Sequence, residues 1–100
     1  MGRTLDSTLR LSGTSQNVTT SGTSAATGNA FDANTYDVRV VCTQNTWIKI
    51  GDGTPTATTG AGSTYMPAGV VEYFHVNPGQ KLAAIQDSAA GTVNVSEMTR

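Results

Sequence analysis

The side chains best suited to catalysis or metal binding are a single histidine, His75, and a single cysteine, Cys42. His75 alternates with Val71 and Tyr73 in a run typical of a strand, and the sequence places no serine or cysteine beside it. A zinc site needs several nitrogen or sulfur ligands, more than one histidine and one cysteine supply. We therefore expect no catalytic residue, no metal site, no cofactor and no enzymatic activity.

The acidic side chains offer no clearer chemistry. No spacing marks two of the acidic residues as a catalytic pair, so we expect their carboxylates to be solvated at the surface. The residues considered are Asp32, Asp37, Asp52, Glu72, Asp87 and Glu97. The segment Gly51–Gly53 lacks the dense oxygen ligands of an EF-hand loop. Gly60 and Gly62 follow no strand–turn–helix pattern, so a phosphate-binding loop is not indicated.

The composition indicates one small domain rich in β structure. Of 100 residues, only 13% are charged and 37% are hydrophobic, and the abundant threonine favours strands. The net charge is −1, and the six basic residues are dispersed, so binding to nucleic-acid phosphates is not expected. No membrane partner is expected, because no apolar run approaches the roughly 18 residues of a membrane span. A lone cysteine, which we expect to be buried, fits a reducing cytoplasm.

Turn residues recur every 8–12 positions or so after Tyr36, which predicts an all-β fold, either a small antiparallel β-sandwich or a jelly-roll-like barrel. The expected strands are Thr8–Ser12, Tyr36–Thr43, Trp47–Ile50, Thr64–Met66, Val70–Val76, Lys81–Gln86 and Thr92–Met98. Residues 1–35 are interpreted as an N-terminal strand and an extended polar arm, after a frayed end at Met1–Asp6, and residues 36–100 as the core of the single domain. The polar segment 14–35 holds either two thin strands, Asn17–Ser21 and Ser24–Asn29, or an arm that lies on a neighbouring subunit.

The stretch Pro67–Gln86 is expected to organise the core. Asn77-Pro78-Gly79-Gln80 has proline and glycine where a type II turn requires them, so an antiparallel hairpin is predicted. Alternation points Val70, Phe74 and Val76 inward. Glu72 shares their face, and because a buried unpaired carboxylate is costly, we expect it at the rim.

Several large side chains are predicted to point outward from the strands. They are Arg39, Val41, Trp47, Lys49, Val71, Tyr73 and His75. Trp, Tyr and Arg are enriched at interface hot spots, and an apolar patch on a small domain usually has a partner. We therefore expect a partner or oligomer contact here, in a homo-oligomer that is a dimer or a trimer. The alternative is that the polar arm or a second sheet covers this face.

Residues 36–99 resemble a group of small bacteriophage proteins encoded beside capsid genes. The resemblance rests on Trp47–Gly51, Pro55–Thr58, Pro67–Gly79, Ala83–Gln86 and the final V-x-V-x-E of Val93–Glu97. It implies a β-sandwich without an active site, acting as a capsid decoration or cement protein. Such a protein binds the major capsid protein or another virion protein, and is assembled into the virion in the host cytoplasm. The alternatives are a tail, connector or fibre-associated module, or a carbohydrate-binding sandwich that stacks Trp47 and Tyr73 on sugar rings.

Overall fold

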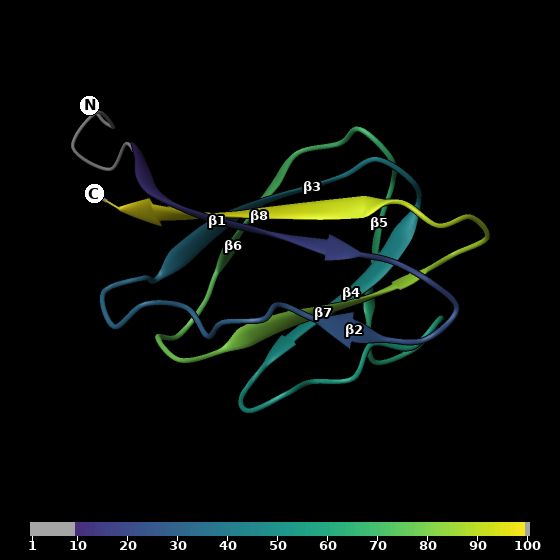
Figure 1. The fold of residues 1–100 in the computed structure, drawn as a ribbon, viewed down its shortest axis with the longest axis horizontal. Coiled ribbons are helices and arrows are strands. Elements are labelled where there is room, and N and C mark those ends of the chain that lie inside the picture. The colour runs from purple at the N-terminus through teal and green to yellow at the C-terminus, as the bar shows by residue number, and fades with distance from the viewer. Residues whose placement is uncertain (1–9, 100) are drawn as a thin grey trace.

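The computed structural model describes residues 10–99, which form two antiparallel four-stranded sheets. The strands are β1 (Arg10–Thr19), β2 (Ala25–Ala26), β3 (Asp37–Cys42), β4 (Thr46–Gly51), β5 (Thr64–Met66), β6 (Glu72–His75), β7 (Lys81–Gln86) and β8 (Thr92–Thr99). Sheet I has the order β1-β8-β3-β6, and sheet II has the order β2-β7-β4-β5. Figure 1 shows the sheets as two layers, with β1 and β8 in the upper layer and β7 and β2 in the lower. The protein is a β-sandwich, which confirms the predicted fold class.

Apolar side chains that alternate along the strands fill the space between the layers. On β8, Val93 and Val95 are buried, as the alternation predicted. From sheet II, Ile48, Leu82 and Ala84 complete the same cluster. The full core is Val18, Phe31, Val38, Val40, Cys42, Ile48, Met66, Val76, Leu82, Ala84, Val93 and Val95.

Residues 14–35 belong to the sandwich of their own chain, so the expectation of an extended arm is corrected for this segment. β1 runs on to Thr19, and Val18 and Phe31 are buried in the core. The backbone also finds partners within the chain, because the Thr27 N–H donates to the Leu82 carbonyl at 2.8 Å. Of the two alternatives, the strands are observed, with bounds that differ from those expected. The predicted strand Thr8–Ser12 is described only from Arg10, where β1 begins, and Met1–Asp6 lies outside the described residues.

The turn in Pro67–Gln86 is confirmed, but the hairpin is wrong. Gly79 has a φ of 86°, and the Gln80 N–H donates to the Asn77 carbonyl at 3.2 Å. However, β6 pairs with β3 in sheet I, whereas β7 pairs with β2 and β4 in sheet II. Phe31, in the loop between β2 and β3, fixes the turn through two backbone hydrogen bonds. Its N–H donates to the Gln80 carbonyl, and its carbonyl accepts from the Gly79 N–H. The chain therefore crosses between the layers at this turn instead of closing a hairpin.

The inward pattern predicted for β6 holds only near the turn. Val76 is buried and Phe74 packs against the core, whereas Val70 is 41% exposed. Glu72 is exposed, which confirms its expected place at the rim. Val70 precedes β6 and is not part of the strand, so the alternation of the strand does not fix the direction of its side chain. The turn before it is held by the Gly69 N–H, which donates to the Cys42 carbonyl.

The outer faces of the two sheets differ in how they are covered. On sheet II, register places Ala83 outward beside Lys49, yet Ala83 is buried. The loop after β4 explains this, because Ala57 is also buried and its N–H donates to the Ser24 hydroxyl at 2.9 Å, next to β2. Part of sheet II is therefore covered by the chain itself. None of the described residues lies in a helix with the length and apolarity needed to span a membrane.

Candidate interaction surface

The structure divides the seven predicted contact residues between two faces. On the outer face of sheet I lie Arg39 and Val41 of β3 and Tyr73 and His75 of β6, with Val71 just before β6. Trp47 and Lys49 lie on β4, on the outer face of sheet II. The expectation that Trp47 shares a face with Tyr73 and His75 is wrong, because β4 and β6 belong to different sheets. The outer faces of a sandwich point in opposite directions.

A shallow groove of about 530 Å³ crosses the outer face of sheet I. Its lining residues are Arg10, Leu11, Arg39, Tyr73, Ser96 and Met98. Strand register explains its shape: Arg39 has Ser96 on one side and Tyr73 on the other, and Leu11 lies opposite Met98. Ser96 is only 9% exposed. Because its side chain is small and its neighbours are large, Ser96 forms the floor of the groove.

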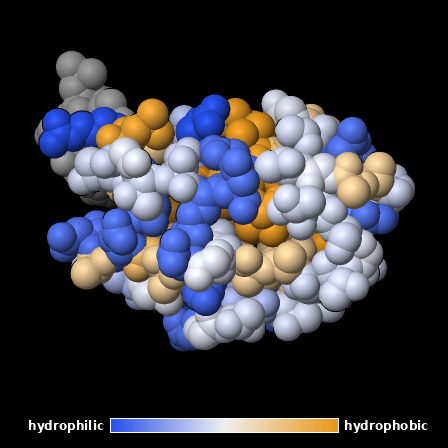
Figure 2. Space-filling model, viewed as in Figure 1, coloured by the Kyte–Doolittle hydropathy of each residue, from blue (hydrophilic) through white to orange (hydrophobic). Residues whose placement is uncertain are grey.

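Two exposed apolar side chains line this groove among polar ones. Leu11 is 64% exposed and Tyr73 is 57% exposed, the largest fractions among the described large hydrophobic residues. On the side shown in Figure 2, apolar side chains form separate patches between polar ones. Exposed apolar surface on that side is therefore confined to small areas. A few exposed apolar side chains around an arginine have the composition of an interface hot spot. Of all the surfaces described, this one is the best candidate for contact with a partner.

Arg39 supplies the charge of the groove. Its side chain is half-buried between Tyr73 and Ser96, and it has no hydrogen-bond or ion-pair partner within the described part of the chain. A guanidinium can donate two parallel hydrogen bonds to one carboxylate. As far as the described residues show, Arg39 is therefore available to bind an anion, and the exposed side chains of Leu11 and Tyr73 line the same groove.

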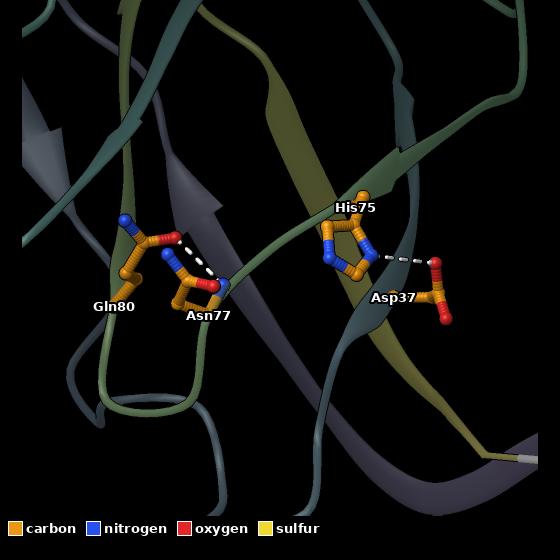
Figure 3. A network of polar contacts seen from close by, with 4 residues as sticks. All are labelled: Asp37, His75, Asn77 and Gln80. Carbon is orange, nitrogen blue, oxygen red and sulfur yellow. Dashed lines mark hydrogen bonds and ion pairs between the residues drawn. The ribbon is translucent and has the colours of Figure 1, made fainter.

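His75 takes part in a polar contact at the end of β6. Its Nδ1 lies 3.5 Å from Asp37 Oδ1, across the β3–β6 pair, and its ring stacks on Tyr36 with centroids 6.4 Å apart. Figure 3 shows His75 pointing toward Asp37, while Gln80 reaches back to the Asn77 backbone across the adjacent turn. The histidine side chain is 69% exposed, so this contact is a surface interaction.

Aromatic side chains form a second, smaller patch on the outer face of sheet II. Trp47 and Tyr65 lie opposite each other on β4 and β5, with ring centroids 5.1 Å apart and planes tilted by 58°. The Trp47 indole N–H donates to Asp87 Oδ1 at 3.0 Å. Trp47 is therefore held in one orientation by its own chain, and its ring is not coplanar with its neighbour.

Glu97 departs from the expectation that the carboxylates are solvated. It is 2% exposed and faces the interior of sheet I, where Oε1 accepts hydrogen bonds from the Asp32 N–H and the Thr35 hydroxyl. Its other oxygen, Oε2, is buried without a hydrogen-bond partner. Glu97 thus fixes the segment between Phe31 and β3. Its neighbours in sequence gave no signal of this contact, because the donors lie more than 60 residues away.

Cys42 is buried, as predicted from its place in an alternating strand. Burial raises the pKa of the Cys42 thiol, and the hydrogen bond with the Thr46 side chain partly offsets this. The described residues contain no cluster of three or more His, Cys, Asp or Glu side chains that could hold a metal ion.

Sequence reasoning missed four of the six residues that line the groove: Arg10, Leu11, Ser96 and Met98. Leu11 lies near the start of β1, and Met98 lies near the end of β8. Both point outward because Ser15–Thr19 and Val93–Glu97 set the register of the β1–β8 pair, and a register shift between Leu11 and Ser15 re-aims the start of β1. Gly13, with a φ of 96°, marks this bulge and was the one available signal.

In comparisons with known proteins, the chain matches no family model, no curated protein and no solved structure.

Proposed function

We propose that this protein is a non-enzymatic structural component of a bacteriophage virion, a capsid decoration or cement protein that binds the major capsid protein lattice and stabilises the shell. The observation that carries the proposal is the open face of sheet I, where Leu11, Tyr73 and Arg39 stand around a groove. The resemblance of residues 36–99 to phage proteins encoded beside capsid genes supports the choice of partner. In this proposal the protein joins the virion in the host cytoplasm.

The contact would act through many weak interactions repeated over a lattice. A chain of 100 residues has a small core, so association adds to its stability as well as to that of the shell. Self-association into a dimer or trimer is part of the same proposal, because each added subunit multiplies the contacts with the lattice. A tail, connector or fibre-associated position in the virion is the runner-up, and it would use the same face.

The carbohydrate-binding alternative has less support. The two aromatic rings expected to stack on sugars, Trp47 and Tyr73, lie on opposite outer faces of the sandwich. Trp47 has Tyr65 beside it instead, at a tilt of 58° that does not make a flat platform. A glycan array probed with the wild-type chain and with Trp47→Ala tests this idea, and a blank array with wild type removes it.

Binding to empty phage shells tests the main proposal. The purified chain is expected to bind them in a fixed ratio to the capsid subunit and to raise their melting temperature. Tyr73→Ser should weaken this binding, whereas Tyr65→Ser, an exposed tyrosine on the other sheet, should bind as wild type does. Failure to bind any capsid lattice would overturn the proposal. Equal loss in both variants would move the contact away from the face of sheet I.

A further inference from the structure

We infer that the groove on the outer face of sheet I binds an extended segment of a partner protein that presents a carboxylate between apolar side chains. Arg39 would hold the carboxylate, and Leu11, Tyr73 and Met98 would receive the apolar side chains. This inference rests on the proposed function and deepens it, because it names the chemistry of the segment that the partner must offer.

Charge selects an acidic occupant. Arg39 lines the groove and has no ion-pair partner among the described residues. The nearest acidic residue on the same face, Asp37, has a side chain that is only 16% exposed and lies against His75. Glu72, although exposed, occupies an inner-face position of β6 opposite Val40. Arg39 is therefore the described groove residue that offers a positive charge to a ligand, even though the whole chain carries a net charge of −1.

Geometry favours a narrow occupant. The hollow exists because Ser15 and Ser96 lie side by side on β1 and β8, while the next row of the sheet carries Leu11 and Met98. Tyr73 and Arg39 close the far side. A space of about 530 Å³ fits a few side chains of an extended peptide. A segment that reaches from Leu11 on β1 to Tyr73 on β6 would run across the strands of sheet I.

The half-buried setting makes Arg39 selective. A guanidinium that is partly withdrawn from water gains more from a carboxylate than an exposed one does, because competing water is reduced. An amide of the same shape offers one neutral acceptor and leaves the charge of Arg39 uncompensated. Replacing the acidic residue of the bound segment by its amide should therefore weaken binding by at least tenfold or so, the size of one charge-assisted hydrogen bond.

Selection from a random-peptide library on immobilised full-length chain tests the inference. Enriched peptides should carry Asp or Glu flanked by apolar residues, and should bind Arg39→Gln at least about tenfold more weakly. Lys49→Gln, which removes a basic residue from the other outer face, should bind them as wild type does. Amide NMR shifts caused by the best peptide should centre on Arg39, Tyr73 and Ser96. The folding of each variant is checked by its melting curve.

Other outcomes would overturn the inference. They are the absence of any enriched peptide, enrichment without acidic residues, or equal binding to wild type and Arg39→Gln. Concentration-dependent self-association lost in Tyr73→Ser would assign the groove to a second copy, and binding to anionic vesicles lost in Arg39→Gln would assign it to a lipid surface. The inference and the proposed function can fail separately, because shell binding that survives Arg39→Gln overturns only the inference. Selection of acidic peptides by a chain that binds no shell overturns only the function.

Discussion

Replacing Glu97 by alanine tests whether this buried carboxylate holds the segment that leads into β3. The substitution removes the Oε1 acceptor from the Asp32 N–H, 3.2 Å away, and from the Thr35 hydroxyl. Thr35 is itself 4% exposed, so its hydroxyl would be left without a nearby acceptor. We expect the segment from Phe31 to Tyr36 to loosen first and to reduce the stability of the whole sandwich.

The expected magnitude follows from opposing terms. Two hydrogen bonds to a charged acceptor contribute about 1.5–3 kcal/mol each. Against this, Oε2 is buried without a partner, so removing the carboxylate recovers an unfavourable desolvation of roughly 1–3 kcal/mol. With the middle value of each range, the net loss of unfolding free energy should be about 2.5 kcal/mol. For a domain of this size that corresponds to a melting temperature lower by roughly 10–20 °C.

Urea denaturation followed by tryptophan fluorescence and circular dichroism measures this loss. Glu72→Ala is the matched control, because Glu72 lies on the same sheet but is exposed and should change stability by less than about 0.5 kcal/mol. Thr35→Val separates the two donors, and the double variant with Glu97→Ala should show a coupling of about 1 kcal/mol or more. If Glu97→Ala is as stable as Glu72→Ala, the contact does not stabilise the fold and the reasoning is refuted.

Three further changes test other parts of the structure. A Cβ at Gly91 would lie 2.7 Å from Thr43 Oγ1 and within 2.9 Å of Gln44, so Gly91→Ala should lower the free energy of unfolding by about 1–3 kcal/mol. Gly22 has open space around it, so Gly22→Ala should be nearly neutral in the same denaturation assay. Gly79→Ala places a side chain at a φ of 86° and should cost about 1–2 kcal/mol; an unchanged midpoint would show that the turn relaxes freely. Burial raises the pKa of the Cys42 thiol above 9.0, so the unfolded chain releases its proton first and stability should fall as pH rises past 9.0. Cys42→Ala should flatten that fall in melts between about pH 8 and 10, and an equal slope in both proteins would contradict the assignment.

The elements that the sequence predicts well are those in which buried and less buried residues alternate. This holds along β3, through Val38 and Val40, and in the first half of β8, through Val93 and Val95, so a period of two identifies both the strand and its inner face. The turn at Asn77–Gln80 was predictable for a different reason, because Gly79 meets a backbone requirement that few other residues satisfy.

Pairing between distant strands was not predictable in this way. A turn reverses the chain but does not decide which strands then exchange hydrogen bonds, and β6 and β7 joined different sheets. The expected shared face of Trp47 and Tyr73 was wrong for the same reason. Alternation shows which residues of one strand point the same way, but it does not show to which sheet each strand belongs. The contacts of Glu97 depend on the loop between β2 and β3, so no local pattern of β8 could have indicated them.

The position of β8 has a consequence for synthesis. β8 is the last described strand in sequence, yet it lies in the interior of sheet I, between β1 and β3. Until Thr92–Thr99 has left the ribosome, those two strands lack the neighbour that joins them, and the open face of sheet I cannot exist. Pairing across such long separations is also slow. The surface that we assign to partner binding is therefore completed only after the chain has reached Thr99, so a nascent chain cannot engage a partner through that face before then.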